Sequence, residues 1–90
     1  MNDLERAEKY FDRGEYFECH EVLEEVWKKT SGKKKVLLQG LIQVAAGLHK
    51  LKQGHPEGAA KLFARAKPKL KIPAPPDLAQ LKKKMVPSAT

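Results

Sequence analysis

The sequence has 90 residues, enough for one domain with a single hydrophobic core and too few for a second. Hydrophobic residues make up 41% and charged residues 32%, the balance of an ordinary soluble globular chain. No apolar run approaches the ~20 residues of a membrane span, and Met1–Arg13 lacks the apolar stretch of a signal peptide. The single cysteine, Cys19, excludes an internal disulfide. Together these features predict a cytoplasmic protein.

The net charge of +7 is divided unevenly along the chain. Residues 1–27 hold nine acidic and three basic side chains, a net charge of −6, whereas residues 28–90 hold fifteen basic and two acidic ones, a net charge of +13. Two oppositely charged halves can attract each other within one fold or across a dimer. The basic surplus therefore does not by itself indicate nucleic-acid binding. Lysines outnumber arginines fifteen to three, so any such binding is expected to be weak and independent of base sequence.

Glycine and proline divide the chain into helical segments. The first helix is predicted to begin at Asn2 or Asp3, either of which can cap it, and to end at Gly14. The second is predicted over about Tyr16–Lys29, where apolar residues recur at helical spacing.

The third helix is predicted over about Lys35–Gln53 and is apolar around most of its circumference, which is typical of a helix buried by its neighbours. Gly40 and Gly47 lie on nearly the same face of this helix. Inside a helix each glycine costs about 1 kcal/mol relative to alanine. The pair therefore predicts that another helix crosses closely at this face.

The fourth helix is predicted to begin at Pro56, a favourable first-turn position. Pro68 should end or kink it near Ala66, because proline lacks the N–H that the helix ladder needs. After the "PAPP" stretch, the segment "DLAQLKKKM" predicts one short helix capped by Asp77.

These elements predict an all-α fold, a compact helical bundle of two helical hairpins plus a short C-terminal helix. A shift of 40 residues places Gly54 on Gly14 and repeats the hairpin pattern. The predicted organisation is a single helical-bundle domain over residues 1–72, then a Pro-rich linker and short basic C-terminal helix or tail over residues 73–90. Because so small a bundle buries little surface by itself, a homodimer is also expected.

The stretch "YFECHEVLEEVW" carries the polar residues that such a bundle does not need for packing. At about 100° per residue, His20 and Glu24 fall between Trp27 and Tyr16 on one side and Phe17 on the other. They are also one helical turn apart, within reach of each other. The first interpretation is a partly buried polar pair, hydrogen-bonded within itself or to Gln39 or Gln43 of the third helix.

Catalytic and metal readings of the same residues are weaker. "HEVLE" resembles the metal-binding pattern H-E-x-x-H with Glu24 in place of the second histidine, which leaves His20, Glu24 and the distant His49 as ligand candidates and Glu21 as a possible base. Because this set is incomplete, no metal and no cofactor are predicted. Cys19 lies in the apolar stripe, where an inert core thiol is expected rather than a nucleophile.

Taken together, the motifs resemble a family of small bacterial and archaeal proteins known as domain-of-unknown-function family 309. The resemblance covers about residues 7–70, and His55 departs from it where the family usually has asparagine. The matching positions include Phe11, Gly14, Tyr16, Phe17, Glu18, His20, Glu21, Leu23, Glu24, Trp27, Gln39 to Gln43, Ala45, Gly54, Gly58 and Ala59.

The resemblance implies a compact helical bundle and supplies no mechanism. Its polar hallmark residues would form a pocket between the second and third helices if they converge: His20, Glu21, Glu24, Gln39 and Gln43, with walls from Tyr16, Phe17 and Trp27. Three functions follow from these patterns. The first is an interaction or scaffold protein that binds a protein or peptide, the second a metal-assisted or acid–base enzyme using His20, Glu21 and Glu24, and the third weak non-specific nucleic-acid binding.

Overall fold

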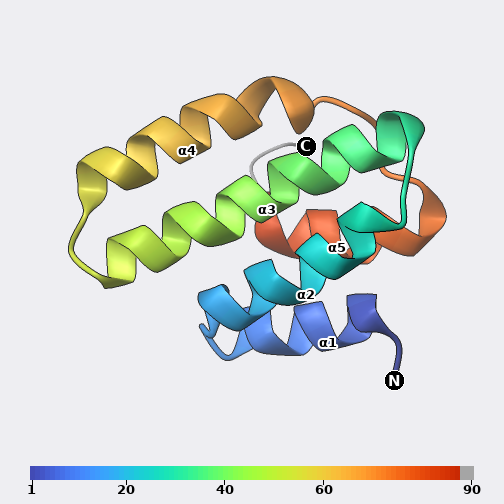
Figure 1. Ribbon diagram of the computed structural model, residues 1–90, viewed down its shortest axis with the longest axis horizontal. Coiled ribbons are helices and arrows are strands. Elements are labelled where there is room, and N and C mark those ends of the chain that lie inside the picture. Colours follow the sequence, from blue (N-terminus) through green and yellow to red (C-terminus); the bar gives the residue numbers. More distant parts are fainter. Residues whose placement is uncertain (88–90) are drawn as a thin grey trace.

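The computed structural model describes residues 1–87 and folds them into five α-helices (Figure 1). No strand occurs among these residues, so the predicted all-α fold is confirmed. In the same residues no helix is long and apolar enough to cross a membrane. The helices are α1 (Asp3–Asp12), α2 (Tyr16–Lys28), α3 (Gly32–Lys52), α4 (Pro56–Lys69) and α5 (Pro76–Met85).

The two helical hairpins, α1–α2 and α3–α4, turn in the same way. Gly14 and Gly54 both have a positive φ, 72° and 81°, a conformation that glycine adopts without a steric penalty. The N–H of Gly14 donates to Phe11 and that of Glu15 to Tyr10, and 40 residues later Gly54 donates to Leu51 and His55 to Lys50. Each pair of bonds satisfies carbonyls at a helix end in the Schellman pattern. The repeat predicted from the sequence is therefore present in the turn geometry.

Helix α3 lies at the centre of the bundle (Figure 1). It packs against α4 on one side, α2 on another and α5 on a third, while α1 packs against α2 and α5. The leucines of this core have at most 1% of their surface exposed. They come from three helices: Leu23 of α2, Leu37, Leu38 and Leu41 of α3, and Leu78 and Leu81 of α5.

The close crossing predicted from Gly40 and Gly47 is confirmed, and the crossing helix is α4. A Cβ atom on Gly47 would lie 2.4 Å from Cε1 of Phe63, and one on Gly40 would lie 2.9 Å from Cβ of Lys69. Contacts that short do not occur between relaxed side chains. The glycines therefore allow α4 to approach the backbone of α3 more closely than any larger residue would.

Three predicted helix boundaries are corrected. Helix α3 begins three residues early, after Ser31 as N-cap. Helix α4 does not end near Ala66, since it includes Pro68 and continues to Lys69. Its last turn is held by tertiary contacts, because Lys69 donates to Oε1 of Gln43 at 2.9 Å and packs against Gly40. Asp77 does not cap α5, whose N-cap is Pro75.

Helix α5 belongs to the same core as the two hairpins. Its Leu78, Leu81 and Met85 are buried among the residues of the other helices. Lys84 joins it to the acidic α1, with Nζ 2.7 Å from Asp12 and 3.3 Å from Glu8. The hydrogen bond to Asp12, followed by that to Glu8, raises the pKa of Lys84. Residues 73–87, predicted from the sequence to form a linker and tail, thus help to close the bundle.

The glycine at position 47 offers a test of the α3–α4 crossing. We expect Gly47→Ala to lower the free energy of unfolding by about 1–3 kcal/mol, because Phe63 must move out of a packed position. Gly58→Ala in α4 is the matched control, since its new Cβ would meet only the flexible chain of Lys50 at 3.3 Å. That variant should be unchanged or more stable by up to about 1 kcal/mol. Urea unfolding of both variants checks this, and an equally stable Gly47→Ala would contradict the tight crossing.

Candidate functional site

The polar residues of α2 meet α3 around one exposed aromatic ring, Phe17. The ring of Phe17 lies 6.1 Å from the imidazole of His20, measured between centroids, and 5.4 Å from that of His49 on α3. It is nevertheless 47% exposed to solvent. We call Phe17, His20, Glu24 and His49 the Phe17 face. Its aromatic side chain is held by neighbours on two helices and presented outward.

His20 is placed between two carboxylates of its own helix. Its Nε2 lies 2.9 Å from Oε1 of Glu24, and its Nδ1 lies 3.8 Å from Oε1 of Glu21. The His20 side chain is 22% exposed, whereas that of Glu24 is 42% exposed. The predicted contact between His20 and Glu24 is therefore present, one helical turn apart.

Both nitrogens of the imidazole are already engaged or covered. Nε2 contacts Glu24, and Nδ1 is shielded from solvent while it makes no hydrogen bond to any of residues 1–87. A general base needs a nitrogen within hydrogen-bond reach of its substrate. As arranged here, His20 offers no such open nitrogen, so the geometry suits a positioned structural group better than a proton carrier.

Of the other predicted pocket residues, some join this face and others do not. Gln43 turns toward α4, where its Oε1 accepts from Lys69, and Gln39 is exposed. Tyr16 packs on Phe11 of α1, with ring centroids 5.5 Å apart. The structure thus brings His20, Glu21 and Glu24 together, whereas Gln43 contacts Lys69 and Tyr16 contacts Phe11.

Trp27 lies at the C-terminal end of the same helix. The ammonium of Lys35 on α3 sits 4.3 Å from the centre of its ring, a cation–π contact between the two helices. Its Nε1 is covered and has no hydrogen-bond partner within the described chain. Trp27 therefore supports the α2–α3 contact by packing.

The metal candidates His20, Glu24 and His49 do not form a complete ligand set. Within residues 1–87 no three His, Cys, Asp or Glu side chains converge as a metal ion would require. The group that contacts both imidazoles is the ring of Phe17. A phenyl ring carries no atom that can bind a metal ion as His, Cys or a carboxylate does. The sequence did not predict this contact of His49 with Phe17.

Cys19 is fully buried in the core. Burial raises the pKa of its thiol to about 12, because the thiolate would lose its hydration. The thiolate is the reactive form of cysteine. The prediction of an inert core thiol is consistent with this environment.

The fold and this face define a class of protein: a small all-α bundle of two helical hairpins, closed by a fifth helix, with an aromatic and carboxylate cluster at the α2–α3 contact. The chain belongs to the family described as Domain of unknown function (DUF309), whose model matches residues 4–62. That range includes the Phe17 face and ends before the last turns of α4.

Two relatives extend the comparison. An uncharacterized protein of Aquifex aeolicus (strain VF5) is 34% identical over 64 residues, which cover 70% of this chain and 19% of that protein. The uncharacterized protein YpuF of Bacillus subtilis (strain 168) is 43% identical over 53 residues, 58% of this chain and 30% of that protein. The chain therefore spans less than a third of either relative. No solved structure matches it.

The His20–Glu24 contact can be tested as a structural pair. We expect His20→Ala to lower the free energy of unfolding by about 1–3 kcal/mol, because Glu24 loses its partner and Phe17 loses a packing surface. Glu24→Gln should lower it by about 1 kcal/mol. Glu25→Gln is the control and should cost less than about 0.5 kcal/mol, since its pair with Lys28 is exposed. Denaturant melts measure all three.

Unchanged or increased stability in both His20→Ala and Glu24→Gln would contradict the structural interpretation. Residues kept for binding or catalysis are often held at the expense of stability. That outcome would make His20, Glu21 and Glu24 the first residues to test in a functional site.

Cys19 provides a second check on the chemistry of this helix. We expect the native protein to resist Ellman's reagent at about pH 8, where a thiol with a pKa of about 12 is ionised in only about one molecule in 10⁴. The same thiol should react at once in denaturant. Rapid labelling of the folded protein would show that Cys19 is accessible and would reopen the nucleophile hypothesis.

Proposed function

We propose that the chain is a helical interaction module and that the Phe17 face is its contact surface. The observation that carries the proposal is the exposed ring of Phe17, 47% accessible yet packed against two imidazoles. An aromatic side chain already fixed in one orientation loses little conformational freedom when a partner covers it. Such aromatic anchors dominate the binding energy of many protein interfaces.

A second copy of the chain is the partner that we propose first. A bundle of 90 residues buries a limited share of its surface, so it gains from an added interface. The charge distribution also suits self-association, because α2 carries Glu18, Glu21 and Glu24 whereas α3 carries lysines, of which Lys52 lies beside Phe17. In a twofold pairing of this face, the acids of one copy can approach the lysines of the other. A protein or peptide partner would use the same ring.

The enzyme and nucleic-acid alternatives have less support. In His20, the candidate base, Nδ1 is covered and Nε2 contacts Glu24. Several lysines of the basic half are used within the fold: Lys84 pairs with α1, Lys34 with Asp77, and Lys69 with Gln43. These contacts reduce the number of lysines free for phosphate. A cytoplasmic location is part of the proposal and rests on the single buried cysteine.

Replacement of Phe17 tests this proposal. We expect the wild-type chain to sediment as a dimer at about 100 μM, and Phe17→Ala to weaken the dimer by about thirtyfold, the loss of a hot-spot side chain. The stability of the folded monomer should change by less than about 1 kcal/mol, because the ring is half exposed.

Val36→Ala is the matched control. Val36 is 41% exposed on α3 but lies about 140° around that helix from His49. It should leave dimerisation unchanged. A wild-type monomer at high concentration, or a Phe17→Ala dimer as tight as wild type, would defeat the proposed pairing.

A further inference from the structure

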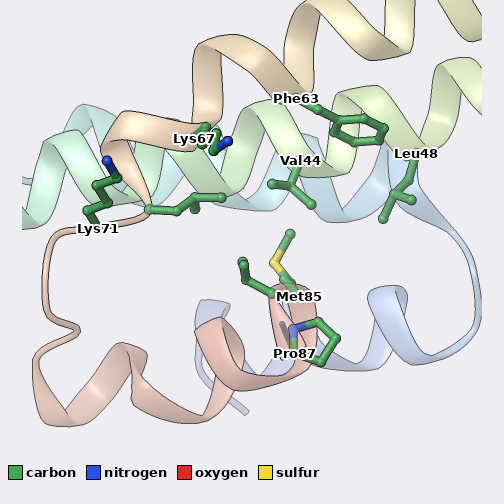
Figure 2. A pocket seen from close by; sticks show the side chains of 9 residues that line it. Val44, Leu48, Phe63, Lys67, Lys71, Met85 and Pro87 are labelled. Atoms are coloured by element: carbon green, nitrogen blue, oxygen red, sulfur yellow. The ribbon is translucent and has the colours of Figure 1, made fainter. Parts of the chain in front are cut away.

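A cavity of about 540 Å³ opens between the C-terminal halves of the second hairpin and α5 (Figure 2). Figure 2 shows Val44 and Leu48 of α3 and Met85 of α5 pointing into the same space, with the ring of Phe63 above them. This volume is within the range of about 300–1,000 Å³ that is usual for small-molecule sites. We call it the C-terminal cavity. It is lined by Val44, Leu48, Phe63, Lys67, Leu70, Lys71, Met85, Val86 and Pro87.

The inner surface of the C-terminal cavity is apolar. Seven of its nine lining residues are hydrophobic or proline, and none has an amide, hydroxyl or acidic side chain. Val44 and Met85 are 7% and 5% exposed, which places them at its floor. Such walls can stabilise an alkyl chain by contact and cannot satisfy a polar group of a ligand. The occupant that fits the interior is therefore a hydrocarbon chain.

The two charged lining residues are both lysines, and both lie on the α4 side. Lys67 and Lys71 are exposed, and within residues 1–87 neither forms an ion pair or a side-chain hydrogen bond. The neighbouring lysines are hydrogen-bonded within the fold. Lys69 donates to Gln43 and to the carbonyl of Arg65, whereas Lys82 donates to the carbonyl of Ile72. Two long cationic side chains at the edge of an apolar cavity suit an anionic group at the end of the chain that fills it.

We propose that the C-terminal cavity binds a fatty acid, with its alkyl chain between Val44, Leu48 and Met85 and its carboxylate paired with Lys67 and Lys71. Binding is noncovalent and involves no reaction. The cavity lies largely outside the family match, since seven of its nine lining residues, from Phe63 onward, follow residue 62. The inference is independent of the Phe17 face, which no lining residue of the cavity shares.

Titration with straight-chain acids tests the proposal. We expect octanoate and decanoate to bind with one site per chain, and decanoate to bind about fifteenfold more tightly, because each buried methylene contributes about fourfold. The methyl resonances of Val44, Leu48 and Met85 should shift on binding. Affinity should stop rising once the chain is longer than the cavity.

Replacement of the lysines separates the carboxylate from the chain. We expect Lys67→Gln/Lys71→Gln to weaken decanoate binding by about tenfold and to leave 1-decanol binding unchanged within about twofold. Lys61→Gln, another exposed lysine of α4 that does not line the cavity, is the control and should change neither. All these variants alter exposed side chains, so the fold should be preserved.

Several results would overturn the inference. One is the absence of saturable decanoate binding up to about 1 mM, because even a weak site with a Kd in that range would be detected there. Equal affinity of wild type for decanol and decanoate, or methyl shifts away from the cavity, would also overturn it. If the methyl shifts depend on protein concentration in the absence of ligand, the occupant of the cavity is a second copy of the chain. If the Met85 methyl instead shows contacts with residues after Pro87, the occupant is the chain's own C-terminus.

Discussion

The close approach of α4 to α3 is the constraint on which the rest of the bundle depends. Gly47 accepts the ring of Phe63, and Gly40 accepts the last turn of α4. With one side of α3 covered at so short a distance, its remaining apolar sides are left for α2 and α5. Phe63 also lines the C-terminal cavity. The same contact therefore fixes the central helix and shapes the space beside it, since packed interiors transmit such constraints.

Three ion pairs among residues 1–87 join different helices. Lys84 connects α5 to the acids of α1, and Lys34 connects α3 to Asp77 at the start of α5. Exposed pairs of this kind contribute little stability each. The Lys84 pairs nevertheless bring opposite charges of the two halves together within one fold, which explains part of the basic surplus without a nucleic-acid partner.

The two candidate surfaces differ in character. The Phe17 face presents a ring on the outside, held by imidazoles and accompanied by carboxylates. The C-terminal cavity presents an apolar interior with lysines at its edge. The first suits a macromolecule, because it offers an exposed anchor, and the second suits a small molecule, because its apolar walls form a concave pocket. The family match contains the first surface and little of the second.

The sequence by itself determined the helices, the glycine turns and the crossing at Gly40 and Gly47, because these depend on local periodicity and on backbone conformation. It also placed His20 next to Glu24, since residues four apart share a helix face. Tertiary structure alone decided that α4 runs through Pro68, that α5 enters the core and that Gln43 turns to Lys69 rather than to His20. The meeting of Phe17 with His49 and the cavity beside Met85 also arise only in the fold. Each depends on how helices distant in the chain are packed, and packing can override the preference of a single residue.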